Sequence, residues 1–178
     1  MKRVLALVFV LGLTASSAKA DAGCNVVFGS DWAFAVSTPA RWMSLCQSGK
    51  DRGAALAVWP QGTLLAYAPA VMSVTVTDKN RPSLALFAAD EQQRLRSTKP
   101  KVTVRFEPGL SVNGRPALVF RVNDARTHQL IAYVEGPTRF FVVKISAGTT
   151  QSLQQSRAAF QTMLNSFTPM RAVLPQAK

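Results

Sequence analysis

Residues 130–167 read LIAYVEGPTRFFVVKISAGTTQSLQQSRAAFQTMLNSF, a pattern of two strands followed by a helix. The runs 130–134 and 139–146 fit β-strands, and the second points three apolar side chains inward: Phe141, Val143 and Ile145. Strands joined by so short a link pair antiparallel. Thr149 or Thr150 then caps a helix with one apolar stripe, made of Leu153, Phe160, Met163, Leu164 and Phe167. This segment therefore predicts a hairpin with a helix packed against it.

The alternation typical of a strand and the spacing typical of a helix also occur earlier in the chain. Residues 71–77 alternate with Met72, Val74 and Val76 on one face, and residues 84–95 have helical spacing that ends before Lys99. Shorter strands are predicted at 32–37, 54–59, 102–106 and 116–122, with Asn113-Gly114 as a hairpin turn before the last of them. The order predicts an α+β fold with a central antiparallel sheet, in one domain over 21–168 with a loose tail over 169–178.

Residues 1–20 have the pattern of a cleaved signal peptide. Lys2 and Arg3 precede an apolar run from Val4 to Leu13, and Ala18-Lys19-Ala20 offers small residues to a signal peptidase. The apolar run is too short to span a bilayer, which takes about 20 residues. No other segment is predicted to be transmembrane, because prolines interrupt the apolar stretch 54–72. We expect a periplasmic or secreted protein.

The two cysteines, Cys24 and Cys46, both lie in the exported part. In an oxidising compartment such a pair predicts a disulfide, which would tie the N-terminal arm to the domain. Lipidation of Cys24 is the weaker alternative, since Asp21, Ala22 and Gly23 do not match a lipoprotein signal.

The 178-residue chain is strongly basic, with 21 Lys and Arg against 9 Asp and Glu and a formal net charge of +12. Loss of Lys2, Arg3 and Lys19 with the signal peptide leaves 18 basic residues and a charge of +9. The candidate partner-binding residues are Arg94, Arg96, Lys99 and Lys101, around the first helix. They predict an acidic protein or an anionic envelope surface as partner, and the alternative is a solvated helix rim. The exported location and the lack of interleaved aromatic residues argue against nucleic acid.

Catalytic and metal-binding patterns are missing from the sequence. His128 is the single histidine, so neither a two-histidine metal site nor any cofactor is predicted. His128 could pair with Asp124 and activate Ser111 or Ser146, but neither serine lies in a nucleophile-elbow pattern. An exposed turn histidine is the favoured interpretation, and no catalytic residue is predicted.

Several motifs resemble a group of uncharacterised exported bacterial proteins and the wider PsbP-like fold, named for an extrinsic protein of photosystem II. The motifs are Trp42, Trp59-Pro60-Gln61-Gly62, Ala68-Pro69-Ala70-Val71-Met72, Val112-Asn113-Gly114-Arg115-Pro116-Ala117, Phe140-Phe141 and Leu164-Asn165-Ser166-Phe167. The resemblance spans roughly residues 30–168 and implies a PsbP-like α/β/α sandwich. It also implies an accessory or binding role, because PsbP-like proteins share no active site.

The leading hypothesis is thus a non-catalytic exported binding protein. An immunity or inhibitor protein against an exported toxin or envelope hydrolase is the first alternative. A hydrolase built on scattered Ser and Asp residues with His128 is the second.

Overall fold

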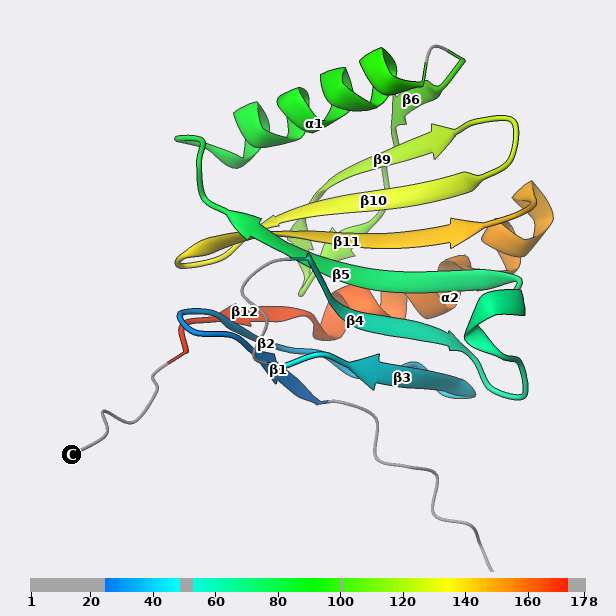
Figure 1. The fold of residues 1–178 in the computed structure, drawn as a ribbon, viewed down its shortest axis with the longest axis horizontal. Coiled ribbons are helices and arrows are strands. Elements are labelled where there is room, and N and C mark those ends of the chain that lie inside the picture. The colour runs from blue at the N-terminus through cyan, green and yellow to red at the C-terminus, as the bar shows by residue number, and fades with distance from the viewer. Residues whose placement is uncertain (1–24, 49–52, 100, 173–178) are drawn as a thin grey trace, which may run out of the picture.

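A seven-stranded antiparallel sheet forms the centre of the protein, with strand order β3-β4-β5-β11-β10-β9-β6 (Figure 1). The computed structural model describes residues 25–48, 53–99 and 101–172. The strands of this sheet are β3 (Trp42–Cys46), β4 (Gly53–Pro60), β5 (Ala70–Asp78), β6 (Thr103–Phe106), β9 (Leu118–Asn123), β10 (His128–Glu135) and β11 (Arg139–Ala147). The helices are α1 (Leu84–Thr98), α2 (Thr150–Ser166) and a 3₁₀ turn, η1 (Leu65–Tyr67). The predicted α+β class is confirmed.

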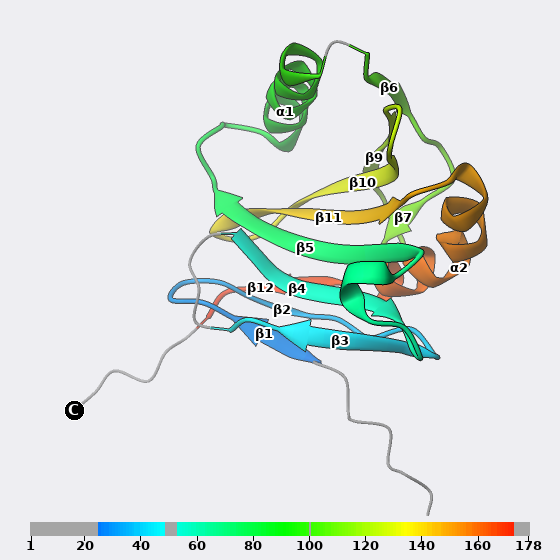
Figure 2. The ribbon, with the colours of Figure 1, turned by 45° about the vertical axis from the view of Figure 1, so that its right-hand side comes forward.

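Alternate side chains of β11 belong to two different cores. Phe141, Val143 and Ile145 join the larger core, which includes the apolar stripe of α2, as predicted. Phe140 and the half-buried Val142 join the smaller core with Phe87 and Ala88 of α1. Because neighbouring residues of a strand point to opposite faces, α1 and α2 contact opposite faces of the sheet. Figure 2 shows the two helices well apart.

A second, three-stranded sheet of order β1-β2-β12 packs into the larger core. It consists of β1 (Val26–Phe28), β2 (Ala33–Ala35) and β12 (Thr168–Met170). Fully buried Phe34 of β2 packs on Phe141, with ring centroids 5.8 Å apart, and on Phe167, at 5.1 Å. Trp32 lies beside both Phe34 and Phe141. The small sheet therefore joins residues from both ends of the described chain.

The strands β1, β3 and β12 differ from the sequence-based expectation. β1 and β3 were not predicted, and β12 takes in Pro169 and Met170, which the predicted boundary at 168 assigns to the tail. β1 and β12 have three residues each, too few to show an alternating pattern. Pro169 also disfavours a strand unless that strand lies at an edge, as β12 does.

The Asn113-Gly114 turn was predicted correctly, but it joins shorter strands than expected. Both residues have positive φ, 48° and 72°, as a type I′ turn requires. They connect β7 (Ser111–Val112) to β8 (Arg115–Pro116), a separate two-stranded ladder. The predicted strands β6 and β9 do pair antiparallel, with Phe106 opposite Phe120. The connection between them is long and contains the small β7–β8 hairpin.

Glu107, just after β6, joins two cations from different elements. Arg121 of β9 donates from Nε and Nη2 to its carboxylate, at 2.8 and 3.0 Å, and Arg157 of α2 donates to it as well. The hydrogen bonds from Arg121 are the main reason that the pKa of Glu107 lies below its usual value. Glu107 thereby ties the edge of the sheet to α2.

Candidate ligand-binding site

A pocket of about 740 Å³ opens at one end of the sheet, where neighbouring strands end at different levels. β9 begins at Leu118, which pairs with Tyr133, whereas β10 continues to Glu135. Val134 and Glu135 are thus paired with β11 but not with β9. Residues from both faces of the sheet line the space that β9 leaves: Leu84, Phe106, Val112, Asn113, Ala117, Leu118, Tyr133, Val134, Glu135, Gly136, Pro137, Phe167, Thr168 and Pro169.

Most of this lining is apolar, and its polar groups are few. Phe106, at the β6 edge, is 57% exposed although it is a large apolar side chain. Asn113 Nδ2 lies 3.4 Å from Thr168 Oγ1, so these two polar groups of the lining face each other. Tyr133 is buried, and burial raises the pKa of its hydroxyl, which therefore stays protonated. An apolar pocket of this volume with a few polar groups is typical of small-molecule sites.

Glu135 is the one charged side chain among the described residues of the lining. Its Oε1 lies 2.5 Å from Nζ of Lys79, which follows β5, and the two side chains are 42% and 32% exposed. Lys79 Nζ also lies 5.8 Å from the centroid of the Phe140 ring, within cation–π range. The carboxylate at the pocket is therefore paired with a cation from the protein itself.

The four predicted partner-binding residues do not form one uniform positive patch. Arg94 donates to Glu91 on its own helix, from Nη2 at 2.6 Å, and Lys99 Nζ lies 2.8 Å from Asp124 Oδ2. Arg96 and Lys101 are exposed and make no ion pair within the part of the chain described. Arg94 and Arg96 are two positions apart on α1, about 200° around the helix, so they point to different sides.

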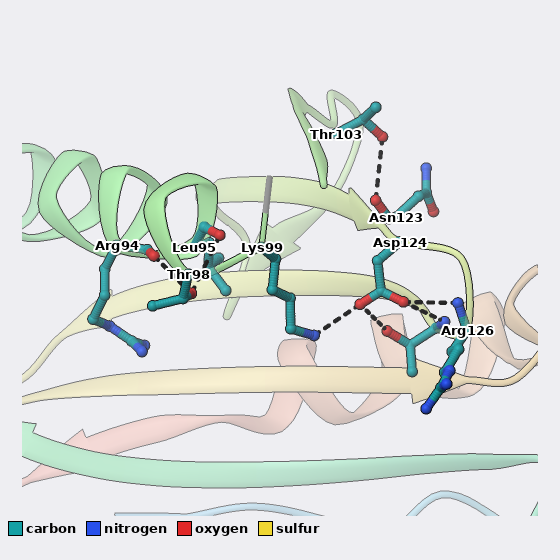
Figure 3. A network of polar contacts seen from close by, with 9 residues as sticks. Arg94, Leu95, Thr98, Lys99, Thr103, Asn123, Asp124 and Arg126 are labelled. Carbon is teal, nitrogen blue, oxygen red and sulfur yellow. Dashed lines mark hydrogen bonds and ion pairs between the residues drawn. The ribbon is translucent and has the colours of Figure 1, made fainter. Parts of the chain in front are cut away.

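Lys99 connects the end of α1 to the turn after β9 (Figure 3). Asp124 accepts hydrogen bonds from Lys99 and from the backbone N–H groups of Arg126 and Thr127. The Lys99 contact and the Arg126 N–H bond hold the pKa of Asp124 far below its usual range. The Asp124 carboxylate therefore stabilises the turn after β9 and holds the end of α1 against it.

The structure does not bring the proposed hydrolase residues together. His128 opens β10, and its Nδ1 lies 3.1 Å from Asn123 Oδ1 and 3.3 Å from Thr150 Oγ1. Among the described residues, the hydrogen bonds of its ring go to Asn123 and Thr150 and not to Asp124 or the two candidate serines. Ser146 lies opposite Gln129 of β10. Ser111 lies on β7, and its backbone N–H and C=O form hydrogen bonds with the side-chain amide of Gln161 on α2. His128 is not part of the pocket lining.

Other predicted features fall partly outside the described residues. The predicted signal peptide at 1–20 and Cys24 lie there, so export and the Cys24–Cys46 pairing stay predictions. Cys46 ends β3 and is not a free thiol in the described part of the chain. No helix among the described residues is long and apolar enough to cross a membrane. In the same residues, no three His, Cys, Asp or Glu side chains cluster as metal ligands would.

A scan of protein-family models finds no match to this chain, and neither does a search of curated proteins. Similar solved structures include a protein of unknown function, PA94, from Pseudomonas aeruginosa, with a TM-score of 0.47 and 11% identity over 77% of this chain and 83% of that one. They also include the cyanobacterial PsbP of Synechocystis sp. PCC 6803, with a TM-score of 0.44 and 15% identity over 77% and 85%. A PsbP protein is thus among the structures similar to this chain, as the sequence motifs indicated, and the likeness concerns the fold alone.

The pocket residues were missed by the sequence analysis. Tyr133 and Glu135 lie on the same face of β10, but the predicted strand ended at residue 134, and nothing in the spacing of these two residues sets them apart. The pocket exists because β9 begins opposite Tyr133 and leaves Val134 and Glu135 of β10 without a partner on that side, which is a property of strand register. The one available signal was Phe106, a large apolar residue at the end of a short strand near a turn.

Proposed function

We propose that the protein is an exported, non-catalytic binding protein that holds a small apolar ligand in the pocket at the end of its sheet. The observation that supports this proposal best is the pocket itself, about 740 Å³ with a mostly apolar lining. Removal of apolar surface from water by a bound ligand is favourable, with a binding free energy of roughly 25 cal/mol for each Å² buried. A pocket of mainly apolar lining thus favours a ligand that is itself mostly hydrocarbon or aromatic.

The position of His128 supports binding over hydrolysis. Catalysis by a histidine requires a nucleophile or a water within hydrogen-bond reach and an open site for the substrate. His128 contacts an amide oxygen and a hydroxyl at the opposite end of β10 from Glu135. The pocket and the single histidine are therefore separate features of the molecule.

The first prediction concerns filling of the pocket. Ala117 is half-buried and lines the pocket, so the Ala117→Phe side chain is expected to occupy space that a ligand needs. The neutral fluorescent probe N-phenyl-1-naphthylamine should bind the wild-type protein saturably. Ala117→Phe should weaken this binding about tenfold or more, a loss of about 1.4 kcal/mol. Fluorescence titration measures both dissociation constants.

The matched control is Ala158→Phe, the same change at an exposed position of α2, which should leave probe binding unchanged. Phe106→Ala provides a second test, since Phe106 lines the pocket but is largely exposed and contributes little to folding. Equal probe affinity of the wild type, folded Ala117→Phe and Phe106→Ala would contradict the proposal.

The second prediction concerns catalysis. Purified protein should show no turnover above background with esterase, phosphatase, peptidase and glycosidase substrates, and His128→Ala should change nothing. The reason is that His128 lies outside the pocket lining, and its ring bonds to the Asn123 amide and the Thr150 hydroxyl rather than to a carboxylate that would orient it as a base. An activity that is present in the wild type and lost in a folded His128→Ala variant would replace this proposal with the hydrolase alternative.

Other parts of the proposal rest on the sequence. They are export by residues 1–20, the Cys24–Cys46 disulfide, the PsbP-like α/β/α layering and an acidic protein or anionic envelope surface as partner. For such a partner, Arg96 and Lys101 are the better candidates, because Arg94 and Lys99 already have carboxylate partners.

A further inference from the structure

We propose that the ligand of the pocket is a cationic amphiphile, with an apolar body in the pocket and an ammonium group on Glu135. This inference rests on the proposed function, since it names the chemical class of the ligand in the same pocket. It concerns the polar end of the pocket, where Glu135 supplies the charge among the described lining residues.

The sign of that charge is unusual for this chain. The sequence has 21 basic and only 9 acidic residues, yet the charged side chain that the described lining presents is a carboxylate. The other polar side chains of the lining, Asn113, Tyr133 and Thr168, are neutral. A carboxylate accepts hydrogen bonds and attracts a cation, so a ligand with an amine is matched and a ligand with a carboxylate is repelled.

Lys79 shows where the ammonium would lie. Its Nζ is 2.5 Å from Glu135 Oε1 and 5.8 Å from the centroid of the Phe140 ring. A carboxylate and an aromatic face together make a suitable environment for an ammonium ion. Lys79 is not part of the pocket lining, so it reaches Glu135 from outside.

Exchange of Lys79 for a ligand ammonium would cost little. Both side chains of the Lys79–Glu135 pair are about one-third exposed or more, and exposed ion pairs contribute little to stability. Lys79 can return to solvent when it leaves Glu135. Lys79 thus competes weakly with the ligand and keeps Glu135 paired when the pocket is empty.

The test uses three ligands with the same alkyl chain and different head groups: dodecylamine, dodecanol and dodecanoate, each below the concentration at which it forms micelles or separates from water. Displacement of N-phenyl-1-naphthylamine from the full exported chain measures the three affinities at neutral pH and low salt. Dodecylamine should bind the most tightly and dodecanoate the least. Added salt should weaken the binding of dodecylamine but not that of dodecanol.

Two variants assign the effect to the ion pair. Glu135→Gln should weaken the binding of dodecylamine several-fold, the size expected for an ion pair at a partly exposed carboxylate, and leave the binding of dodecanol unchanged, because the charge is lost and the shape is kept. Lys79→Met should raise the affinity for dodecylamine several-fold, because the ammonium that competes for Glu135 is gone while an apolar side chain of similar length remains. Both positions are partly exposed, so thermal melts should confirm folded variants.

Equal affinity of the wild type for dodecylamine and dodecanol would overturn the inference. So would tight binding of dodecanoate that Lys79→Met abolishes, since the head-group site would then be cationic. In both cases the pocket would still be a binding site. Failure of all three ligands and of the probe to bind would instead contradict the proposed function itself.

Discussion

Phe141→Ala is expected to lower the free energy of unfolding by about 3–5 kcal/mol. Phe141 is fully buried in the middle of the larger core, where its ring contacts Trp32, Phe34 and Phe167 at centroid distances of 5.6–6.3 Å. Truncation leaves a cavity beneath three aromatic rings from two distant parts of the chain, which the core can fill only in part. Urea unfolding followed by far-UV circular dichroism measures the change.

Phe106→Ala is the matched control, because the same atoms are removed from a side chain that is 57% exposed. Its effect should stay within about 1 kcal/mol. A loss of less than 1 kcal/mol for Phe141→Ala would show that the small sheet and the central sheet do not share the core described here.

Glu107→Gln is expected to destabilise the protein by about 1–3 kcal/mol at pH 7. The substitution removes the negative charge between Arg121 and Arg157, whose side chains are only 27% and 26% exposed, and leaves both cations without their carboxylate. The glutamine keeps the size of the side chain, so the loss reports on charge rather than packing. Urea unfolding at several pH values measures it.

The pH dependence of this difference follows from the lowered pKa of Glu107. A carboxyl group with a depressed folded pKa contributes stability above its unfolded value, roughly 4.3, and loses it as the pH falls through the folded value. The gap between wild type and Glu107→Gln should therefore be fully present at pH 7 and narrow below pH of about 4. A gap that does not change with pH would contradict an electrostatic origin.

Asp90→Asn serves as the control for this second substitution. Asp90 pairs with Arg81, and the two side chains are 46% and 49% exposed. Exposed pairs contribute about 0–1 kcal/mol, so this variant should unfold close to the wild type at every pH.

Sequence analysis located the long elements because their pattern repeats several times. The five-membered stripe of α2 and the alternation in β5 and β11 agree with the buried residues of the larger core. Thr149, one of the two predicted caps, accepts a hydrogen bond from the N–H of Ser152 at 3.0 Å. The periodicity of a strand or helix and the cap of a helix depend on residues close together in the chain, so they can be read from one sequence.

Features that depend on distant neighbours were not predictable in this way. The small sheet brings Phe34 against Phe167, and the pocket depends on the level at which β9 starts beside β10. The partner of Lys99 could not be found from the sequence, because Asp124 lies 25 residues further along the chain. An excess of basic residues is visible in the sequence, but which of them are paired with carboxylates depends on the fold.

The pairing of β12 with β2 has a consequence for how the chain folds during synthesis. Ala35 lies opposite Thr168, so the small sheet closes only after the chain has been made as far as Thr168. Contacts between such distant residues form late and slow folding. Until then Phe34 lacks the Phe167 ring that packs on it, and this aromatic side chain is open to chaperones or to aggregation. Pairing of β12, the last strand of the described residues, is therefore a late step of folding.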